Sequence, residues 1–389
     1  MKLLIGGSPC THWSIAQTKA RETVPAGLGW ELFLNYVIAK EKYSPDFFLY
    51  ENNKSMSPAI KEQITRELGV EPILINSALV SAQSRQRLYW TNIPGVEQPK
   101  DRGIVLRDIL ETGVPLREKA YAVLTTARSA TAEDVIRRRQ RNGAAIPVNI
   151  TADGKAQCLR ATYYKGGIRN LIANTVDRKT CVAVPAGLAW RGRGDSSSYE
   201  IRNDQKANTV TADGHQSRLV IEMPDGQESP AYEVRGGYIS IKGQQYPVRL
   251  ADGFYMIRKL TVTECKRLQT VPEWYRFPVS QTQAYKMLGN GWTVDVIAHI
   301  LSYCPGIDTE PLEVFSMYDG MSCGRLALER LGAKIARYYA TEIDKFAIQT
   351  TQANFPDTIQ LGDAFQVRES DWNLYKQATD RTIPRITGT

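Results

Sequence analysis

The sequence predicts an α/β fold with a parallel or mixed sheet, together with a smaller β-rich domain. First, residues 1–95 and 312–365 alternate short apolar runs with helical patterns, as βαβ units do. Second, residues 98–255 hold short β-like pieces separated by Gly and Asp turns. Third, 389 residues with 42% hydrophobic and 23% charged side chains are enough for about two or three domains and exclude disordered and collagen-like classes.

Apolar runs and their periods define the expected elements. Strands are expected at 3–5, 47–50, 72–81, 87–90, 312–317, 334–341 and 358–361. A first helix is expected where Leu32, Phe33, Tyr36 and Val37 share one face. Further helices are expected at 131–140, 261–270, 293–304, 325–331 and 344–353, within a return to helical pattern over 256–303 and a last α/β segment after Cys304–Gly306.

The middle region carries a weak internal repeat. The tetrapeptide T-A-D-G occurs at 151–154 and again at 211–214, between β-like runs of similar wording. Asp-Gly between such runs is typical of a hairpin. Two copies are too few for a solenoid, so we expect two similar hairpins in one small β-rich domain.

Most of the net positive charge lies in one stretch of the chain. The formal net charge is +8, and residues 131–220 hold 15 Lys and Arg against 8 Asp and Glu, a net +7. Such a concentration is typical of a surface that faces phosphates. The competing interpretation is a basic domain that is simply solvated, so the charge alone leaves nucleic acid binding open.

Other features exclude several classes of protein. No run of about 18 apolar residues occurs, and the start, MKLLIGGSPC, has too short an apolar run for a signal peptide. The six cysteines are scattered without a C-x-x-C pair, which argues against a disulfide framework and a structural zinc site. We expect a cytoplasmic protein with no membrane partner and no bound metal.

Three successive strand ends carry residues suited to an adenosine-type cofactor. The turn Asp319–Gly324 follows the strand at 312–317, and glycine lets the backbone approach a ligand at the carboxyl end of a parallel strand. Glu342 closes the next strand, where a carboxylate accepts from ribose hydroxyls, and Asp363 ends the third. One Gly-rich turn is weak evidence, but the three together favour such a cofactor. The absence of G-x-G-x-x-G disfavours a dinucleotide.

A cysteine follows the first predicted strand. Cys10 lies on the turn after Gly6–Gly7, where nearby N–H groups or cations can stabilise the thiolate and make it a nucleophile. An isolated Cys is more often a small apolar filler. Glu51 ends the next strand, and Arg85 and Arg87 are expected to point to one face of another. These side chains form one candidate constellation, although each charged residue alone is more often part of a surface ion pair.

With these segments assembled, the chain resembles the DNA (cytosine-5)-methyltransferase family. Pro9-Cys10 resembles the catalytic loop of that family, and Glu51-Asn52 resembles its Glu-Asn-Val motif, with Asn53 in place of Val. The other matches are Gln83-x-Arg85-x-Arg87, the Leu-Thr motif from Arg258 to Pro272, Gly289 to Val294, and the cofactor motif Ser316 to Gly324. The cofactor motif has the form known from phage and vertebrate de novo enzymes.

The order of these motifs departs from that of the family. The family begins with the cofactor motif and continues to the Pro-Cys loop, whereas here the cofactor motif comes last. The chain therefore resembles a circular permutation. A permutation leaves a sheet intact when the old ends are close and the new ends lie in an exposed loop.

The resemblance implies a fold, a division of the chain and a partner. The fold is a Rossmann-like S-adenosylmethionine-dependent methyltransferase sheet with a smaller, β-rich target-recognition domain. The segments are a catalytic half at 1–97, the target-recognition domain at 98–255, return helices at 256–311 and the S-adenosylmethionine-binding half at 312–389. The partner is double-stranded DNA, bound by a monomer through phosphate and base contacts. The location is the cytoplasm of a bacterium or a phage-infected cell.

The resemblance also implies catalytic roles. Cys10 attacks carbon 6 of a cytosine flipped out of the duplex, Glu51 binds ring nitrogen 3, and Arg87, with Arg85, binds the carbonyl oxygen at carbon 2. S-adenosylmethionine supplies the methyl group that carbon 5 receives. His12 and His215 are candidate DNA contacts, with an ordinary solvated or capping role as the alternative for His215.

The implied cofactor residues fall into two groups. The adenosine part is bound at the strand ends, by Tyr318 stacked on adenine, Glu342 at the ribose and Asp363 at the adenine amino group, and Ile343 is a further cofactor-binding residue. The methionine end is surrounded by two glycine-bearing turns, with Asp319, Gly320, Gly324, Asn290, Gly291 and Trp292. Core packing is an equally supported alternative for Trp292.

Two other functions stay open at this point. Methylation of cytosine in RNA, as in the tRNA-modifying branch of the family, is disfavoured by the long recognition insert. A non-catalytic DNA-binding relic is disfavoured by the complete set of Cys10, Glu51 and Arg87.

Overall fold

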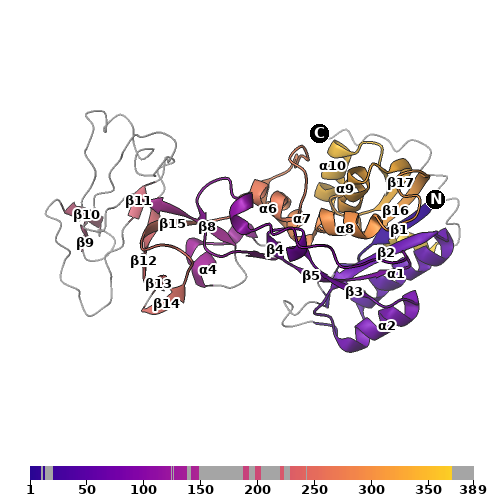
Figure 1. The fold of residues 1–389 in the computed structure, drawn as a ribbon, viewed down its shortest axis with the longest axis horizontal. Helices are drawn as coiled ribbons and strands as arrows, with labels where there is room; N and C mark the ends of the chain where they lie inside the picture. The colour runs from indigo at the N-terminus through magenta and orange to yellow at the C-terminus, as the bar shows by residue number, and fades with distance from the viewer. Residues whose placement is uncertain are drawn as a thin grey trace. The chain divides into compact units, whose positions relative to one another are not determined.

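The computed structural model describes residues 1–9, 12–13, 21–123, 125, 127–137, 142–148, 187–191, 198–202, 220–222, 228–241 and 243–369. The chain divides into two compact units. The sheet unit comprises Met1–Val105, Lys119–Arg128 and Val262–Thr389, and the β unit comprises Leu106–Glu118 and Ser129–Thr261 (Figure 1). The sheet unit therefore unites the two α/β segments that lie at opposite ends of the sequence.

A seven-stranded sheet organises the sheet unit. Its order is β18 (Ile359–Gly362), β17 (Lys334–Thr341), β16 (Pro311–Met317), β1 (Lys2–Gly6), β2 (Phe47–Asn53), β5 (Gln86–Thr91) and β3 (Ile73–Asn76). The first five strands are parallel, whereas β5 runs antiparallel to both β2 and β3. The predicted α/β fold class is confirmed, and the sheet is mixed.

The parallel pairing of β1 with β16 joins the first and the last α/β segments of the chain in the centre of this sheet. Leu3 lies opposite Val314, and Ile5 lies opposite Ser316. From this pair the sheet extends through β17 to β18 on one side and through β2 to β5 and β3 on the other. Ligands of open α/β sheets bind beyond the carboxyl ends of the strands, at such a point of divergence. The sheet is continuous despite the permuted motif order, as predicted.

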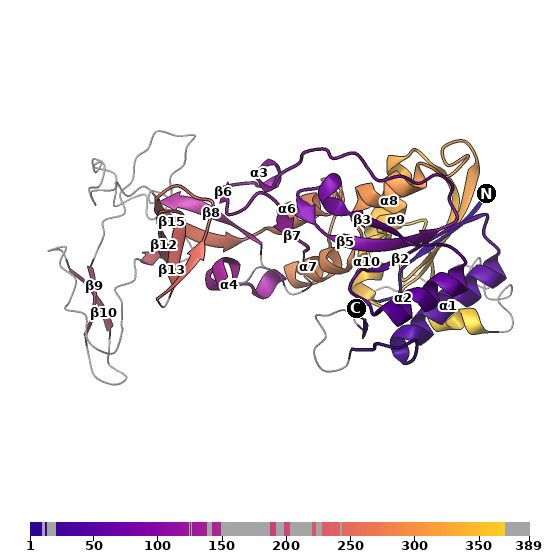
Figure 2. The same ribbon diagram turned by 60° about the horizontal axis from the view of Figure 1, so that its bottom comes forward.

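Two helices cover one face of the sheet (Figures 1 and 2). They are α1 (Leu28–Tyr43) and α2 (Pro58–Leu68). Phe33 and Tyr36 of α1 and Ile60 of α2 pack with Leu4 of β1 in one apolar core cluster. The face of α1 that contains Phe33 and Tyr36 is the face that the apolar spacing predicts.

The helices of the C-terminal segment lie on the other face of the sheet (Figures 1 and 2). They are α8 (Val294–Leu301), α9 (Cys323–Arg330) and α10 (Lys345–Asn354), and α6 (Val262–Leu268) and α7 (Gln281–Asn290) precede them in the chain. Since strand side chains alternate between faces, Leu4 packs with α1 and Ile5 packs with α9. A Cβ at Gly324 would lie 2.2 Å from Cδ1 of Ile5, so this glycine sets the distance between α9 and β1.

The β unit contains an antiparallel sheet. Its order is β14 (Gln244–Pro247), β13 (Tyr238–Ile241), β12 (Glu228–Arg235), β15 (Gly253–Lys259), β8 (Gly143–Val148) and β6 (Val114–Pro115), and β11 (Val220–Glu222) pairs with β12. Val135 and Ile136 of α4 (Ala132–Arg137) pack in its core. β9 (Gly187–Arg191) and β10 (Ser198–Arg202) form a separate antiparallel pair. The prediction of a smaller β-rich domain is confirmed.

One prediction for this region is wrong, and others lie outside the described residues. Residues 256–259 continue β15 instead of beginning the helical segment, because Met256 pairs with β12 and the following residues pair with β8. The predicted hairpins at 151–154 and 211–214, with His215, are outside the described ranges. So are residues 138–140 of the helix expected at 131–140.

Short elements complete the described part of the chain. They are β4 (Gln83–Ser84) and β7 (Ala120–Tyr121), α3 (Leu106–Ile109), and the 3-10 turns η2 (Ser77–Leu79), η3 (Ala127–Ser129) and η6 (Ala364–Arg368). No helix among the described residues combines the length and the apolar character needed to cross a bilayer. Within the same ranges, no group of three or more His, Cys, Asp and Glu side chains is arranged to hold a metal ion.

Gly324→Ala is expected to destabilise the sheet unit. The added Cβ meets Cδ1 of the buried Ile5 at 2.2 Å. Overpacking costs about 1–3 kcal/mol, which outweighs the roughly 1 kcal/mol that alanine gains over glycine in a helix. Urea unfolding measures the difference. Because Ile5→Val removes Cδ1, I5V/G324A is expected to recover part of the loss, and an equal effect of G324A with and without I5V contradicts the packing explanation.

Candidate active site

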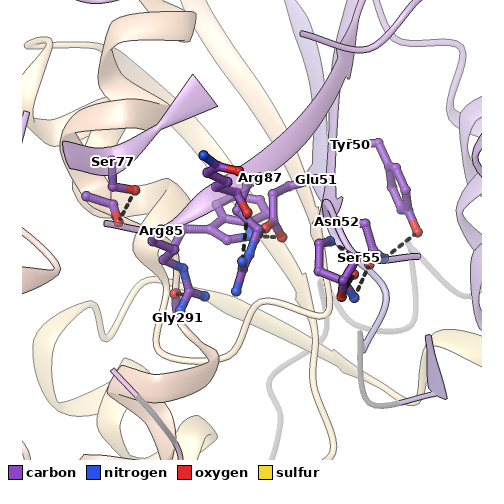
Figure 3. A network of polar contacts seen from close by, with 12 residues as sticks. Tyr50, Glu51, Asn52, Ser55, Ser77, Arg85, Arg87 and Gly291 are labelled. Atoms are coloured by element: carbon purple, nitrogen blue, oxygen red, sulfur yellow. Dashed lines mark hydrogen bonds and ion pairs between the residues drawn. The ribbon is translucent and has the colours of Figure 1, made fainter. Parts of the chain in front are cut away.

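The backbone that leads from β1 toward Cys10 is held by residues of β2. Ser8 Oγ lies 2.7 Å from the hydroxyl of Tyr50, and Asn52 Nδ2 donates to the carbonyl oxygen of Ser8 at 3.2 Å and to the Tyr50 hydroxyl at 3.2 Å (Figure 3). These three side chains are buried. Cys10 itself lies outside the described residues. The sequence identified Asn52 only as part of a motif, and its contact with Ser8 gives it a structural task.

Residues after Cys10 are held by a second set of contacts. Trp13 is completely buried, and its indole N–H donates to Oε2 of Glu22 at 3.0 Å. The Glu22 amide donates to the carbonyl of His12 at 2.9 Å, and Oε1 of Glu22 accepts from the Gly29 amide at the start of α1. His12 Nδ1 lies 3.4 Å from Oε1 of Glu22. The backbone on both sides of the segment that carries Cys10 is thus attached to the sheet unit.

Glu51 is buried and has a donor at each carboxylate oxygen. Oε1 lies 2.9 Å from Nε of Arg87, and Oε2 accepts from the indole N–H of Trp292 at 2.9 Å. Figure 3 shows Glu51 and Arg87 facing each other. The strand expected to end at Glu51 continues to Asn53, because pairing with β5 extends β2. In that register Glu51 and Arg87 are diagonal cross-strand neighbours, which explains their ion pair.

Arg85 binds two backbone carbonyl groups of a distant segment. It is buried, and its terminal nitrogens donate to the carbonyls of Gly289 at 3.2 Å and Gly291 at 3.0 Å (Figure 3). Arg85 lies in the break between β4 and β5, so the expectation that Arg85 and Arg87 share one face stays a prediction. Strand alternation therefore does not relate the two side chains.

Two glutamines support the segment that contains Gly291, Gln269 directly and Gln83 through Gln269. Gln83 Nε2 donates to the Leu268 carbonyl and to Oε1 of Gln269, both at 2.8 Å. Gln269 Nε2 donates to the carbonyls of Leu288 at 2.6 Å and Gly291 at 3.2 Å. Both side chains are buried, where amide groups need partners. The task of these two residues was not predictable from the sequence, because their partners are distant in the chain.

Glu342 joins the carboxyl ends of β16 and β17. Its Oε2 accepts from the Gly320 amide at 2.8 Å, and its Oε1 accepts from the amides of Ile343 and Asp344, each at 2.8 Å. Gly320 has φ of 57°, which glycine adopts without strain. The structure thus brings together the predicted glycine turn and the predicted acid.

Asp319 points into the protein. It accepts from the hydroxyls of Ser316 at 2.6 Å and Tyr338 at 2.8 Å, and from that of Ser322. Burial, and to a lesser extent the charge of Glu342, raise the pKa of Asp319 to about 6, while the three hydroxyl groups oppose the shift. Its carboxylate is thus used within the turn between β16 and α9.

The other predicted cofactor residues differ in exposure. Tyr318 is half-buried, and its hydroxyl donates to the Leu32 carbonyl at 2.7 Å. Ile343 is 74% exposed, and Asp363 is exposed and accepts from the Phe365 amide at 3.0 Å. Asn290 is exposed at the end of α7. Glu342, Ile343 and Asp363 follow parallel strands, so they lie along one edge of the sheet.

Comparison with known proteins gives a consistent family. The model of the C-5 cytosine-specific DNA methylase family matches residues 1–305. Type II methyltransferase M.FnuDI of Fusobacterium nucleatum is 25% identical over 311 residues, 77% of this chain and 74% of that protein. DNA (cytosine-5)-methyltransferase DRM2 of Arabidopsis thaliana is 31% identical over 88 residues, 23% of this chain and 14% of that protein. The crystal structure of S. pombe Dnmt2 methyltransferase has a TM-score of 0.30 at 14% identity, covering 77% of this chain and 76% of that chain.

The family match covers more than half of the chain. It includes the Pro-Cys, Glu-Asn and Gln-x-Arg-x-Arg motifs on which the resemblance was based. The resemblance is confirmed: the chain belongs to the C-5 cytosine-specific DNA methylase family, and it is a DNA (cytosine-5)-methyltransferase.

Proposed function

We propose that this enzyme transfers the methyl group of S-adenosylmethionine to carbon 5 of a flipped cytosine in a specific duplex DNA sequence, through a covalent adduct with Cys10. The observation that carries the proposal is the Glu51–Arg87 pair, 2.9 Å apart, on β2 and β5, the two strands that follow β1 in the sheet. β1 leads into Pro9-Cys10, and the acid-bearing ends of β16 and β17 lie at the same edge of the sheet. A nucleophile, a carboxylate with a cation, and cofactor ligands then share one edge.

Cys10 acts as nucleophile in this proposal. Its thiolate attacks carbon 6 of the cytosine, so a sulfur–carbon bond forms and the electron pair of the 5,6 double bond moves toward carbon 5. S-adenosylmethionine, when bound, would supply the methyl group to carbon 5, and its carbon–sulfur electron pair would stay on the departing S-adenosylhomocysteine. Loss of the carbon-5 proton to a base returns the electron pair, breaks the bond to Cys10 and leaves 5-methylcytosine.

Glu51 and Arg87 control the charge on the ring. Glu51 binds nitrogen 3 and shares a proton with it, so that negative charge does not accumulate as the thiolate attacks. Arg87 donates to the carbonyl oxygen at carbon 2, where charge also develops. The contacts of Arg85 with Gly289 and Gly291 support a positioning task for that residue. The base reaches these groups only outside the duplex, which costs a few kcal/mol, recovered in the pocket.

The strand-end residues fit an adenosine-type cofactor. An ionised carboxylate offers about four lone-pair sites, so Glu342 can accept from ribose hydroxyls besides its three backbone donors. Ile343 presents an exposed apolar side chain beside it, which suits the face of adenine, and the exposed Asp363 suits its amino group. Asp319 accepts from three hydroxyl groups of the protein, so we assign it to supporting the turn that contains Gly320 and Gly324. Tyr318, Asn290 and Gly291 complete the proposed cofactor set.

The basic stretch is proposed to bind DNA. Residues 131–220 carry a net +7 and fall within the segment 98–255 that we propose as the target-recognition domain of a monomer. Lys and Arg there would contact phosphates and a few side chains would read bases in the major groove. The remaining segments are proposed as the catalytic half at 1–97, the return helices at 256–311 and the cofactor half at 312–389. Of the return segment, residues from Val262 on belong to the sheet unit, and those up to Thr261 belong to the β unit.

Cys10→Ala is expected to abolish covalent capture of DNA. Duplex DNA that contains 5-fluorocytosine blocks the loss of the carbon-5 substituent, so an enzyme that attacks carbon 6 stays attached after denaturation. The measurement is a denaturing gel of wild type and C10A with labelled DNA and S-adenosylmethionine. Cys304→Ala, at a buried cysteine of the sheet unit, is the matched control and keeps capture. Equal capture by wild type and C10A contradicts the covalent step.

Glu342→Gln is expected to weaken binding of S-adenosylmethionine. A hydrogen bond to a charged group contributes about 1.5–3 kcal/mol, so Kd rises roughly 10-fold or more. Titration calorimetry measures the affinity, and thermal unfolding shows that the variant is folded. Glu62→Gln, the same chemical change on the exposed side of α2, serves as the control. An unchanged Kd in E342Q rules out contact between this carboxylate and the cofactor.

Plasmid DNA incubated with the enzyme is expected to carry 5-methylcytosine within one short sequence. Strand-resolved bisulfite sequencing identifies the methylated positions, and tRNA given the same treatment is expected to stay unmodified. Methyl transfer to tRNA in preference to the plasmid would contradict the proposed substrate. Methylation spread over unrelated sequences would contradict the proposed specificity.

A further inference from the structure

We propose that Trp292 is a positioning residue for methyl transfer, which acts by orienting the carboxylate of Glu51. This inference rests on the function proposed above for Glu51. From the sequence, Trp292 was expected to close the cofactor site or to fill the core. The hydrogen bond between its indole N–H and Oε2 of Glu51, at 2.9 Å, favours a third task.

The Glu51 carboxylate is fixed by donors on both of its oxygens. Arg87 Nε lies 2.9 Å from Oε1, and Trp292 Nε1 lies 2.9 Å from Oε2. With one donor, a carboxylate can still rotate about its last bond; with two donors from different elements it cannot do so without losing one. Glu51 is only 8% exposed, so water does not readily replace a lost donor. Indole is suited to this task because it is rigid and is a donor only.

Trp292 is itself held by the backbone on both sides. The Gly291 carbonyl accepts from Arg85 at 3.0 Å and from Gln269 at 3.2 Å. On the other side, the Thr293 hydroxyl donates to Gln269 Oε1 at 2.9 Å and lies 2.9 Å from Ser77 Oγ. The Arg85, Gln269 and Thr293 side chains are buried, so these bonds are shielded from water. The turn therefore presents the indole in one orientation.

The same pair lies against the backbone that leads to Cys10. A Cβ at Gly7 would lie 2.7 Å from the Glu51 carbonyl oxygen, 3.1 Å from Glu51 Oε2 and 3.5 Å from Cζ2 of Trp292. Gly7 is three residues before Cys10. If the Glu51 carboxylate changes direction, it does so next to the segment that leads to Cys10. The change then alters the position of the acid relative to that segment and to the bound cytosine.

The three interpretations of Trp292 predict different kinetics for Trp292→Phe. Phenylalanine keeps an aromatic ring and removes the N–H. If Trp292 orients Glu51, the single-turnover rate of methyl transfer falls roughly 10- to 100-fold, the range for a hydrogen bond to a charged group, while KM for S-adenosylmethionine stays unchanged. If Trp292 holds the cofactor, KM rises and the rate at saturation is kept. If it only fills the core, Tm falls and the rate of the folded enzyme is kept.

Trp90→Phe is the matched control. The Trp90 indole N–H donates to Thr65 Oγ1 at 3.0 Å in the core of the same unit, so W90F loses one indole hydrogen bond away from Glu51. We expect W90F to transfer methyl groups at the wild-type rate. An equal fall in W90F and W292F overturns the proposal, because the effect would then be general.

A double-variant cycle separates this inference from the function on which it rests. If Trp292 acts through the Glu51 carboxylate, W292F lowers the rate much less in Glu51→Gln than in wild type. The same fold decrease in both backgrounds, or a rise in KM for S-adenosylmethionine alone, overturns the positioning task and leaves the role of Glu51 intact. A wild-type rate in E51Q overturns both, because the carboxylate would then have no part in transfer.

Discussion

The parallel pairing of β1 with β16 is the interaction on which the site depends. β1 leads into Pro9-Cys10, and β16 leads into the turn from Tyr318 to Gly324. Parallel neighbours have their carboxyl ends at the same edge, so this pairing brings together two segments from opposite ends of the sequence. β2 pairs with β1 on its other side and adds Glu51 to that edge. The position of the site residues therefore depends on the order of the strands in the sheet and not on the order of the segments along the sequence.

Most motif residues of the site bind backbone or other side chains of the protein. Arg85, Gln83 and Gln269 are buried and bind carbonyl groups of other segments, and Asn52 does the same for Ser8. Buried polar groups without partners are costly, so each of these contacts fixes the segments that it joins. A rigid frame of this kind lets a few groups, such as the Glu51 carboxylate, be held in defined directions.

Local pattern was sufficient for much of the fold. The strand predicted at 334–341 is β17 with the same bounds, since its apolar run is flanked by clear breaks. Glu51 and Arg87 belong to one predicted constellation because each lies near the end of a predicted strand, and their ion pair places them together. The partner of Trp292 and the direction of Arg85 could not be predicted, since the first depends on a contact with a distant segment and the second on a break between two short strands. The position of Cys10 stays a prediction.

Gly7 has a consequence for how such sequences diverge. The Glu51 backbone, the Glu51 carboxylate and the Trp292 ring lie where a side chain at this position would be. A substitution at this position is compatible with the site only if the other two change with it, although they belong to motifs far apart in the chain. Positions 7, 51 and 292 should accordingly covary among relatives. An enzyme with a different residue at the position of Gly7 should also have a different residue at the position of Glu51.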